Sequence, residues 1–131
     1  MTNSIEETAT VLVIEDKPDL KNYYELNGFP LGTVMHFALT LAEGRRLFYG
    51  HQESLDMIIM DGRVDRPFVE TLELLREIRE FGFARPILTS SNGYKYRIAM
   101  IEAGCDQMIK KVFQSSDLEC LYPEIFRSIS L

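Results

Sequence analysis

The sequence contains no tryptophan, only two histidines and only two cysteines. Cys105 and Cys120 have no cysteine or histidine at the spacing of metal ligands, so the sequence supports neither a zinc site nor a disulfide framework. We expect both thiols to be reduced and to lie in the core or near it, where free cysteines are most often found.

Hydrophobic runs long enough to cross a membrane are also missing, since no segment approaches the roughly 20 apolar residues that a bilayer requires. Residues 1–7 are acidic and polar and lack the basic start and apolar stretch of a secretion signal. We therefore expect a cytoplasmic protein without membrane insertion, with a flexible N-terminal segment at residues 1–8 and one domain over residues 9–131.

Basic residues are too few for a nucleic-acid-binding surface. Lys and Arg together number 14, against 20 Asp and Glu, which gives a formal net charge of -6. Sequence-independent binding to nucleic acid needs a surplus of positive charge that displaces counterions from phosphates. The chain is therefore not expected to bind DNA or RNA directly.

Five short apolar runs are present, and amphipathic stretches lie between most of them. The runs span residues 10–14, 33–37, 55–60, 86–90 and 106–109. With short connections and right-handed crossovers, this alternation predicts an α/β fold in a single domain. The specific expectation is a flavodoxin-like, doubly wound five-stranded parallel sheet in the strand order 2-1-3-4-5.

The helices between these runs differ in how clearly the sequence marks them. The clearest apolar face lies in residues 69–79 and is formed by Val69, Leu72, Leu75 and Ile78. Residues 38–48 show a similar face formed by Ala38, Leu41, Ala42, Leu47 and Phe48. Residues 94–103 are expected to turn Ile98 and Ile101 inward and to stop at Gly104.

The first and last helices are placed by proline and glycine. The first is expected to begin near Pro18 and to end before Gly28. In the last, Ser116-Asp117 resembles a helix cap, yet Pro123 follows six residues later. That helix either kinks at Pro123 or begins near Tyr122.

Polar residues come directly after four of the apolar runs. These residues are Glu15-Asp16, Asp61, Ser90-Ser91 and Lys110-Lys111. The carboxyl ends of parallel strands meet at one edge of the sheet, which is where open α/β sheets bind their ligands. The sequence therefore predicts that these side chains converge on one site.

Three carboxylates, from Glu15, Asp16 and Asp61, would meet at that edge. Unit charges about 4 Å apart repel by about 4 kcal/mol at an effective dielectric constant of about 20, so the cluster requires a compensating cation. Oxygen ligands without nearby histidine or cysteine favour a hard ion, and a phosphate partner favours Mg²⁺. An aspartate after a strand is often only a helix cap, but here a hydroxyl and an ammonium accompany the carboxylates.

These motifs resemble the receiver domain of two-component response regulators, and the resemblance covers nearly the whole chain. Its pieces are Val11-Leu12-Val13-Ile14-Glu15-Asp16 with Pro18-Asp19-Leu20, Leu55-Asp56-Met57-Ile58-Ile59-Met60-Asp61, residues 86–91, and Glu102-Ala103-Gly104-Cys105-Asp106 running to Lys111 and Phe113. Each piece alone is weak, but their order and spacing together are specific.

The resemblance implies that Asp61 accepts a phosphoryl group from a histidine kinase or phosphotransfer protein. It also implies that Mg²⁺, or Mn²⁺ in its place, is held by Asp16, Asp61 and the main-chain carbonyl of Arg63, with Glu15 acting through water. The domain would catalyse its own phosphorylation and dephosphorylation without being a turnover enzyme.

The remaining roles concern signalling. By the same resemblance, Lys111 would contact the phosphoryl group, and the hydroxyl of Ser91 would turn towards it and pull the adjoining loop inward. The altered face would then be read by a downstream effector protein. The resemblance also allows a homodimer.

The chain departs from the family at several positions. Counting from Pro86 places the switch hydroxyl at Ser91, whereas counting back from Gly104 places it at Thr89. We favour Ser91, because the strand fixes the first count and the second crosses a loop. Spacing from Gly104 similarly favours Lys111 over Lys110 as the lysine that contacts the phosphoryl group.

Three further substitutions affect this edge. Val112 replaces a family proline that is usually preceded by a cis peptide bond. The loop that carries Lys111 is therefore expected to have a different conformation from that of the family. Met108 replaces a frequent aromatic residue that follows the switch hydroxyl. The side chain of Arg63 either reaches over the pocket or points to solvent.

Two functions are compatible with this pattern. The first is an active phosphoacceptor at Asp61, which we favour because all five expected side chains are present. The second is a degenerate receiver that acts as a phosphorylation-independent protein-interaction module and retains the acidic pocket for stability.

Overall fold

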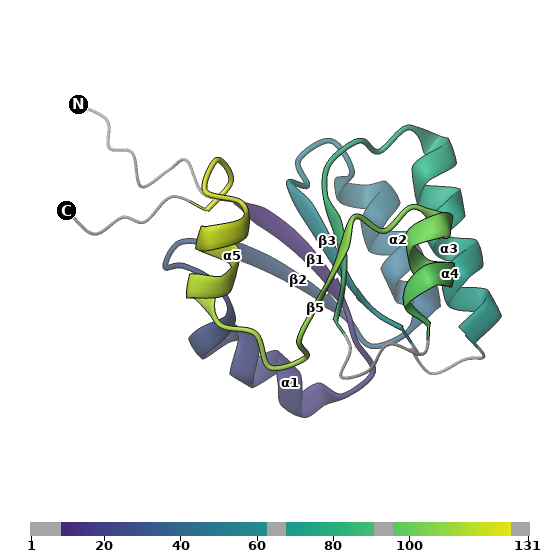
Figure 1. The fold of residues 1–131 in the computed structure, drawn as a ribbon. Helices are drawn as coiled ribbons and strands as arrows, with labels where there is room; N and C mark the ends of the chain where they lie inside the picture. The colour runs from purple at the N-terminus through teal and green to yellow at the C-terminus, as the bar shows by residue number, and fades with distance from the viewer. Residues whose placement is uncertain (1–8, 63–67, 91–95, 127–131) are drawn as a thin grey trace.

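The computed structural model describes residues 9–62, 68–90 and 96–126 (Figure 1). The strands are β1 (Thr10–Ile14), β2 (Val34–Ala38), β3 (Met57–Asp61), β4 (Ile87–Ser90) and β5 (Gln107–Ile109). The helices are α1 (Pro18–Tyr23), its π-helical continuation η2 (Tyr24–Gly28), α2 (Leu41–His51), α3 (Phe68–Phe81), α4 (Arg97–Ala103) and α5 (Ser115–Leu121).

The five strands form one parallel sheet in the order β2-β1-β3-β4-β5, which confirms the predicted topology. Helices α1 and α5 cover one face of the sheet, and α2, α3 and α4 cover the other (Figure 1). The strands begin and end within two residues of their expected bounds. Of the described residues, no helix is both long enough and apolar enough to span a membrane.

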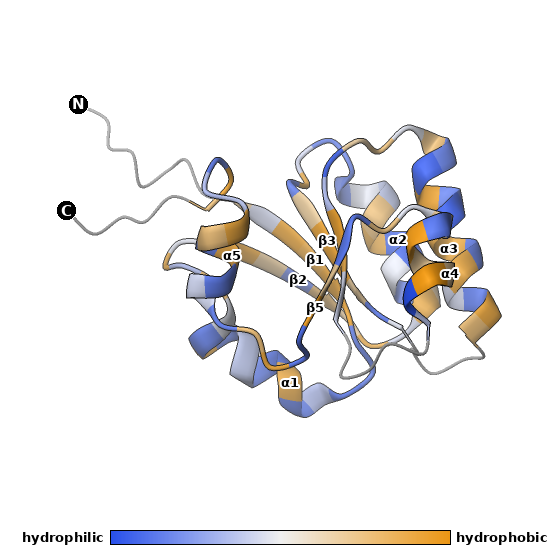
Figure 2. Ribbon diagram, in the orientation of Figure 1, coloured by the Kyte–Doolittle hydropathy of each residue, from blue (hydrophilic) through white to orange (hydrophobic). Residues whose placement is uncertain are grey.

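The hydrophobic core has two halves because both faces of the central strands are covered. Leu12 and Ile58 pack on the α2–α4 side, and Val11 and Ile59 pack on the α1–α5 side. All four side chains are completely buried. Burial on both faces explains why these strands are continuous hydrophobic runs without polar alternation (Figure 2).

Helix α2 begins later than its apolar pattern suggests. Thr40 is its N-cap, and the hydroxyl of Thr40 accepts a hydrogen bond of 3.0 Å from the main-chain N–H of Glu43. The prediction that Ala38 and Ala42 form part of its inward face was therefore wrong. Ala38 is the last residue of β2 and Ala42 is exposed.

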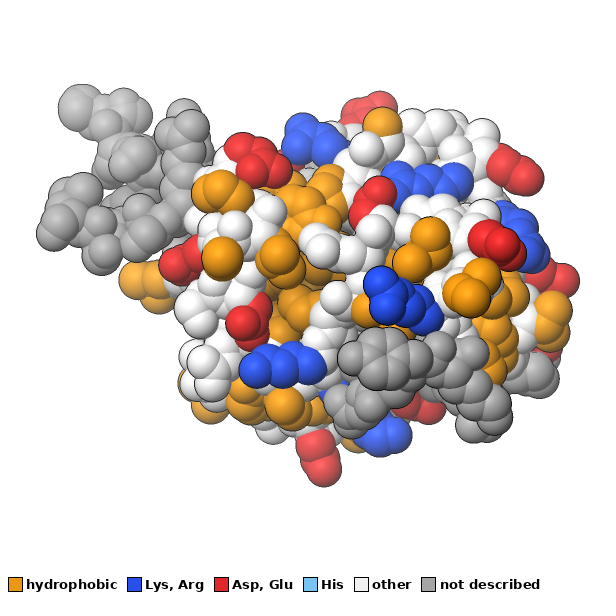
Figure 3. All heavy atoms as spheres, viewed as in Figure 1, with side chains coloured by type: hydrophobic (Ala, Val, Ile, Leu, Met, Phe, Trp, Pro, Cys, Tyr) orange, Lys and Arg blue, Asp and Glu red, His pale blue; other side chains and the backbone are white. Residues whose placement is uncertain are grey.

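The inward faces of α3 and α4 also differ from the expected ones. Leu72, Leu75 and Ile78 of α3 are buried as predicted, but Val69 is exposed. In α4 the prediction was wrong for both isoleucines: Ile98 and Ile101 are 72% and 41% exposed. The buried residues of this helix are Met100 and Ala103. Figure 3 shows hydrophobic side chains at the surface over α4.

Helix α5 neither kinks at Pro123 nor begins near Tyr122, so both expectations for it were wrong. It begins after Gln114 in a capping box with Asp117 and ends at Leu121, before the proline that cannot continue it. Cys105 is buried as expected, but Cys120 of α5 is exposed.

Arg79 joins the two loops at the amino ends of β4 and β5. Its guanidinium donates hydrogen bonds of 2.9 Å to the carbonyls of Gly104, Phe83 and Arg85, and one of 2.7 Å to Asp106. Gly104 has a φ of 125°, and a Cβ there would lie 2.6 Å from Cγ of Arg79. Position 104 therefore has little room for a side chain.

Candidate functional site

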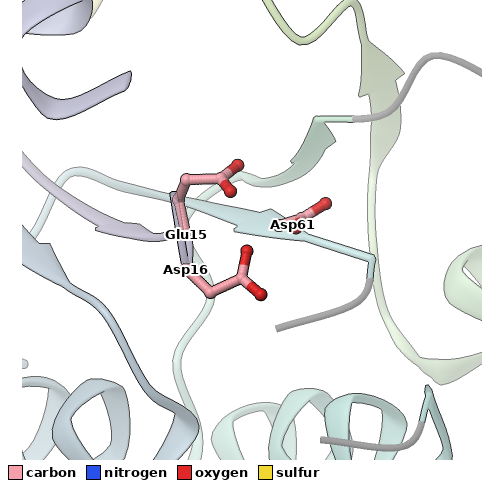
Figure 4. Close-up of side chains that lie close together, drawn as sticks. All are labelled: Glu15, Asp16 and Asp61. Carbon is pink, nitrogen blue, oxygen red and sulfur yellow. The ribbon is translucent and has the colours of Figure 1, made fainter. Parts of the chain in front are cut away.

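Three carboxylates meet at the carboxyl edge of the sheet. Glu15, Asp16 and Asp61 each offer an oxygen that lies within 4.8 Å of the others. Figure 4 shows the three side chains pointing to the same side of β1 and β3. The predicted convergence of these residues is thus present in the structure.

Strand register explains the convergence. Ile14 at the end of β1 pairs with Met60, so Glu15 and Asp61 continue adjacent strands at the same level. The main-chain N–H of Glu15 donates a 2.9 Å hydrogen bond to the carbonyl of Ala38 in β2, which fixes the turn after β1. Asp61 in turn pairs with Ser90 of β4.

Lys111 reaches this cluster from the loop after β5. Its ammonium donates a 2.9 Å hydrogen bond to Oδ1 of Asp61 and lies 3.4 Å from Oε1 of Glu15. The side chain of Lys110 is exposed, and among the described residues no hydrogen bond or ion pair places it at the carboxylates. Three carboxylates and one ammonium leave a formal charge of about -2 when all four groups are ionised.

The environment of Glu15 opposes its ionisation. It is completely buried, and burial together with the charge of Asp61 raises its pKa to about 7, although Lys111 lowers it in part. The main-chain N–H of Lys17 donates a 3.1 Å hydrogen bond to Oε2 of Glu15. Within the described part of the chain, Oε1 has no hydrogen-bond partner, although it faces the ammonium of Lys111.

The donor set fits a hard divalent cation. All three side chains offer oxygen, one of these oxygens is buried without a hydrogen bond, and the cluster carries excess negative charge. Oε1 of Glu15 faces the ammonium of Lys111 at 3.4 Å, but one ammonium does not balance three carboxylates, and a cation would offset the remaining negative charge. The residues therefore fit Mg²⁺ or Mn²⁺.

The ammonium of Lys111 remains charged in this setting. Burial opposes its charge, but the hydrogen bond and charge of Asp61, together with Glu15, outweigh burial and raise its pKa. A protonated lysine next to a carboxylate can stabilise an incoming anion.

Sequence reasoning missed the contribution of Tyr24. The hydroxyl of this buried residue donates a 2.7 Å hydrogen bond to the carbonyl of Lys111, and Tyr23 donates one of 3.2 Å to the carbonyl of Val112. No cis peptide bond occurs in the described segments, so Val112 follows a trans bond. The pair of adjacent tyrosines late in the first helix was the only signal available in the sequence.

The residues expected to act as a switch are only partly described. Thr89 is buried, and its hydroxyl lies 2.9 Å from Sγ of Cys105. Met108 is the central residue of β5 and pairs with Thr89. Ser91 and Arg63 lie outside the described residues, so their roles stay predictions.

No family model matches the chain. The chain is 26% identical, over 125 residues, to a probable transcriptional regulator of Guillardia theta. The match covers 94% of this chain but 47% of the regulator, so the chain spans about half the length of that relative.

Solved structures resemble the chain over nearly its whole length. The N-terminal domain of an uncharacterized protein from Wolinella succinogenes matches with 27% identity and a TM-score of 0.72, covering 90% of this chain and 94% of that one. A response regulator receiver domain protein from Clostridium thermocellum matches with 24% identity and a TM-score of 0.66, covering 89% and 93%. The chain thus has the fold of response regulator receiver domains, which confirms the resemblance indicated by its motifs.

Proposed function

We propose that this chain, which has the fold of response regulator receiver domains, is a phosphoacceptor whose acceptor residue is Asp61. The observation that carries the proposal is the placement of Lys111, 2.9 Å from Asp61, beside three carboxylates whose oxygens lie within 4.8 Å of one another. This arrangement combines a nucleophile, a cation site and a fixed positive charge.

The transfer itself needs little covalent machinery. A carboxylate oxygen of Asp61 attacks the phosphorus of a phosphohistidine, and a phosphorus–oxygen bond forms. The bond between phosphorus and the donor nitrogen breaks, and its electron pair goes to that nitrogen. Lys111 keeps its proton throughout and offsets the charge on the phosphoryl oxygens.

A bound Mg²⁺ would supply positive charge beside the phosphoryl oxygens and offset the excess charge of the carboxylates. Its proposed ligands are Asp16, Asp61 and the main-chain carbonyl of Arg63, with Glu15 acting through water. The excess negative charge of the three carboxylates over the single ammonium of Lys111 supports a cation at this place.

The proposed signalling role follows from the acceptor. The donor would be a histidine kinase or phosphotransfer protein, and the reader would be a downstream effector protein. We propose Ser91 as the switch hydroxyl, because Thr89 is engaged with Cys105 inside the sheet. The domain would then be a signalling element and not a turnover enzyme.

Phosphorylation by a small donor tests this function without knowledge of the cognate kinase. The protein is incubated with acetyl phosphate and Mg²⁺, and the intact mass is followed over time. We expect one phosphoryl group to be added to the wild type and none to Asp61→Asn. Chelation of the metal should abolish the addition.

A matched control is available on the same strand segment. Asp56, just before β3, accepts a hydrogen bond from the main-chain N–H of Thr10, at the opposite end of the strand from Asp61. Asp56→Asn should therefore still be phosphorylated. A wild type that takes up no phosphoryl group under these conditions would contradict the proposal and favour the protein-interaction module.

A further inference from the structure

Tyr24 connects two segments that are far apart in the sequence. It lies at the start of η2, and its hydroxyl donates a hydrogen bond to the carbonyl of Lys111 after β5. Its ring also stacks on Phe113 with centroids 4.6 Å apart. One side chain thus fixes both the main chain and the packing of the lysine loop.

The π-helix is built to allow this contact. Gly28 at its end is buried, and a Cβ there would lie 3.1 Å from Cε1 of Phe113 and 3.2 Å from Cβ of Tyr24. The absence of a side chain at Gly28 therefore lets the helix end pack closely against both rings. π-helical turns are rare and are found frequently at functional sites.

The position of this hydroxyl matters for the ammonium of Lys111. The ammonium lies 2.9 Å from Oδ1 of Asp61, and the carbonyl bonded by Tyr24 belongs to the same residue. We propose that Tyr24 is a positioning residue, which fixes the Lys111 main chain and thereby holds its ammonium against Asp61. This inference rests on the phosphoacceptor function proposed above.

A purely structural role for Tyr24 is the competing explanation, because buried tyrosine hydroxyls generally find a hydrogen-bond partner. Tyr122 provides the matched control. Its hydroxyl accepts a 2.8 Å hydrogen bond from Gln107 of β5, so it supports the strand that precedes the lysine loop without contacting Lys111. A structural role would make the two hydroxyls equivalent.

The test compares Tyr24→Phe, Tyr122→Phe and wild type in two measurements. The first is the rate of phosphorylation by acetyl phosphate with Mg²⁺. We expect Tyr24→Phe to be phosphorylated about tenfold more slowly than wild type, because a small misplacement of a catalytic group slows a reaction by about this much. The rate of Tyr122→Phe should stay within about twofold of the wild-type rate.

The second measurement is the affinity for Mg²⁺, obtained by titration without any phosphoryl donor. The ammonium of Lys111 competes with a cation for Asp61, so its release in Tyr24→Phe should tighten Mg²⁺ binding by about threefold. Lys111→Ala should tighten binding further and sets the limit. A general loss of stability would weaken binding instead.

The outcomes separate the two proposals. If the wild type is phosphorylated but Tyr24→Phe keeps its rate and its Mg²⁺ affinity, or if Tyr122→Phe behaves like Tyr24→Phe, the positioning role is refuted alone. If the wild type is never phosphorylated, the proposed function fails, and the Mg²⁺ affinities of wild type and Tyr24→Phe decide the positioning role. Equal affinities, or no Mg²⁺ binding by either protein, refute that role. Should Tyr24→Phe not fold, Gly28→Ala displaces the same ring, and the same two changes are expected.

Discussion

Replacement of Glu15 by glutamine should stabilise the metal-free protein at pH 8. Glu15 is completely buried beside Asp61, and burial is the first cause that raises its pKa from 4.5 to about 7. Glutamine removes the charge and keeps the shape. Its carbonyl can still accept the hydrogen bond from the main-chain N–H of Lys17.

The sign of the pH dependence follows from the direction of this shift. The folded protein binds the proton of Glu15 more tightly than the unfolded chain does, so Glu15 favours folding below pH 4.5. That contribution is lost as the pH rises towards 7. Each unit of pKa corresponds to about 1.4 kcal/mol, so the rise from 4.5 to about 7 is worth up to about 3 kcal/mol.

Urea unfolding in the presence of EDTA measures this effect. At pH 8 the free energy of unfolding of Glu15→Gln should exceed that of wild type by about 2 to 3 kcal/mol, and at pH 5 the difference should fall below about 1 kcal/mol. The exposed Glu53 provides the control, because Glu53→Gln should change stability by less than about 0.5 kcal/mol at either pH. A gain that is equal at both pH values, or a loss at pH 8, would refute the reasoning. Added Mg²⁺ should stabilise wild type more than Glu15→Gln.

Two further predictions concern regions away from the site. Gly104→Ala should lower the free energy of unfolding by about 2 kcal/mol or more, because φ is 125° and the new Cβ would lie 2.6 Å from Cγ of Arg79. Gly82 has a φ of 113° and no atom within 4 Å of the position of an added Cβ, so Gly82→Ala should lower the free energy of unfolding by only about 1 kcal/mol in a urea titration. Equal losses of stability in the two variants would show that the contact with Arg79 is unimportant. His36 stacks on His51 with ring centroids 4.0 Å apart. Burial, and then the charge of His51, lower the pKa of His36 below 6.5. The unfolded chain therefore binds this proton more tightly, and the free energy of unfolding should decrease as the pH falls below 6.5. His51→Gln should raise the pKa of His36 in an NMR titration, and an unchanged value would argue against the interaction.

The sheet could be predicted from the sequence because the central strands are buried on both faces. Residues such as Val13 and Ile59 therefore form hydrophobic runs whose length alone indicates a strand. The convergence of Glu15 and Asp61 followed from the same runs, since parallel strands place their carboxyl ends at one edge. These features depend on short stretches of sequence and on general rules of topology.

Other features could not be predicted because their causes are not local. Helix α4 is only seven residues long, so fewer than two complete turns define its inward face, and Ile98 was assigned to the wrong side. Tyr24 and the carbonyl that it bonds are 87 residues apart in the sequence. Its role depends on the packing of η2 against the loop after β5, which no local sequence pattern indicates.

The hydrogen bonds of Arg79 have a mechanical consequence for the whole domain. They tie together the loops that lead into β4 and β5, at the end of the sheet opposite to Asp61. Both strands are thus anchored where they start. A displacement of Lys111 at the opposite edge would therefore leave the spacing between the starts of β4 and β5 intact.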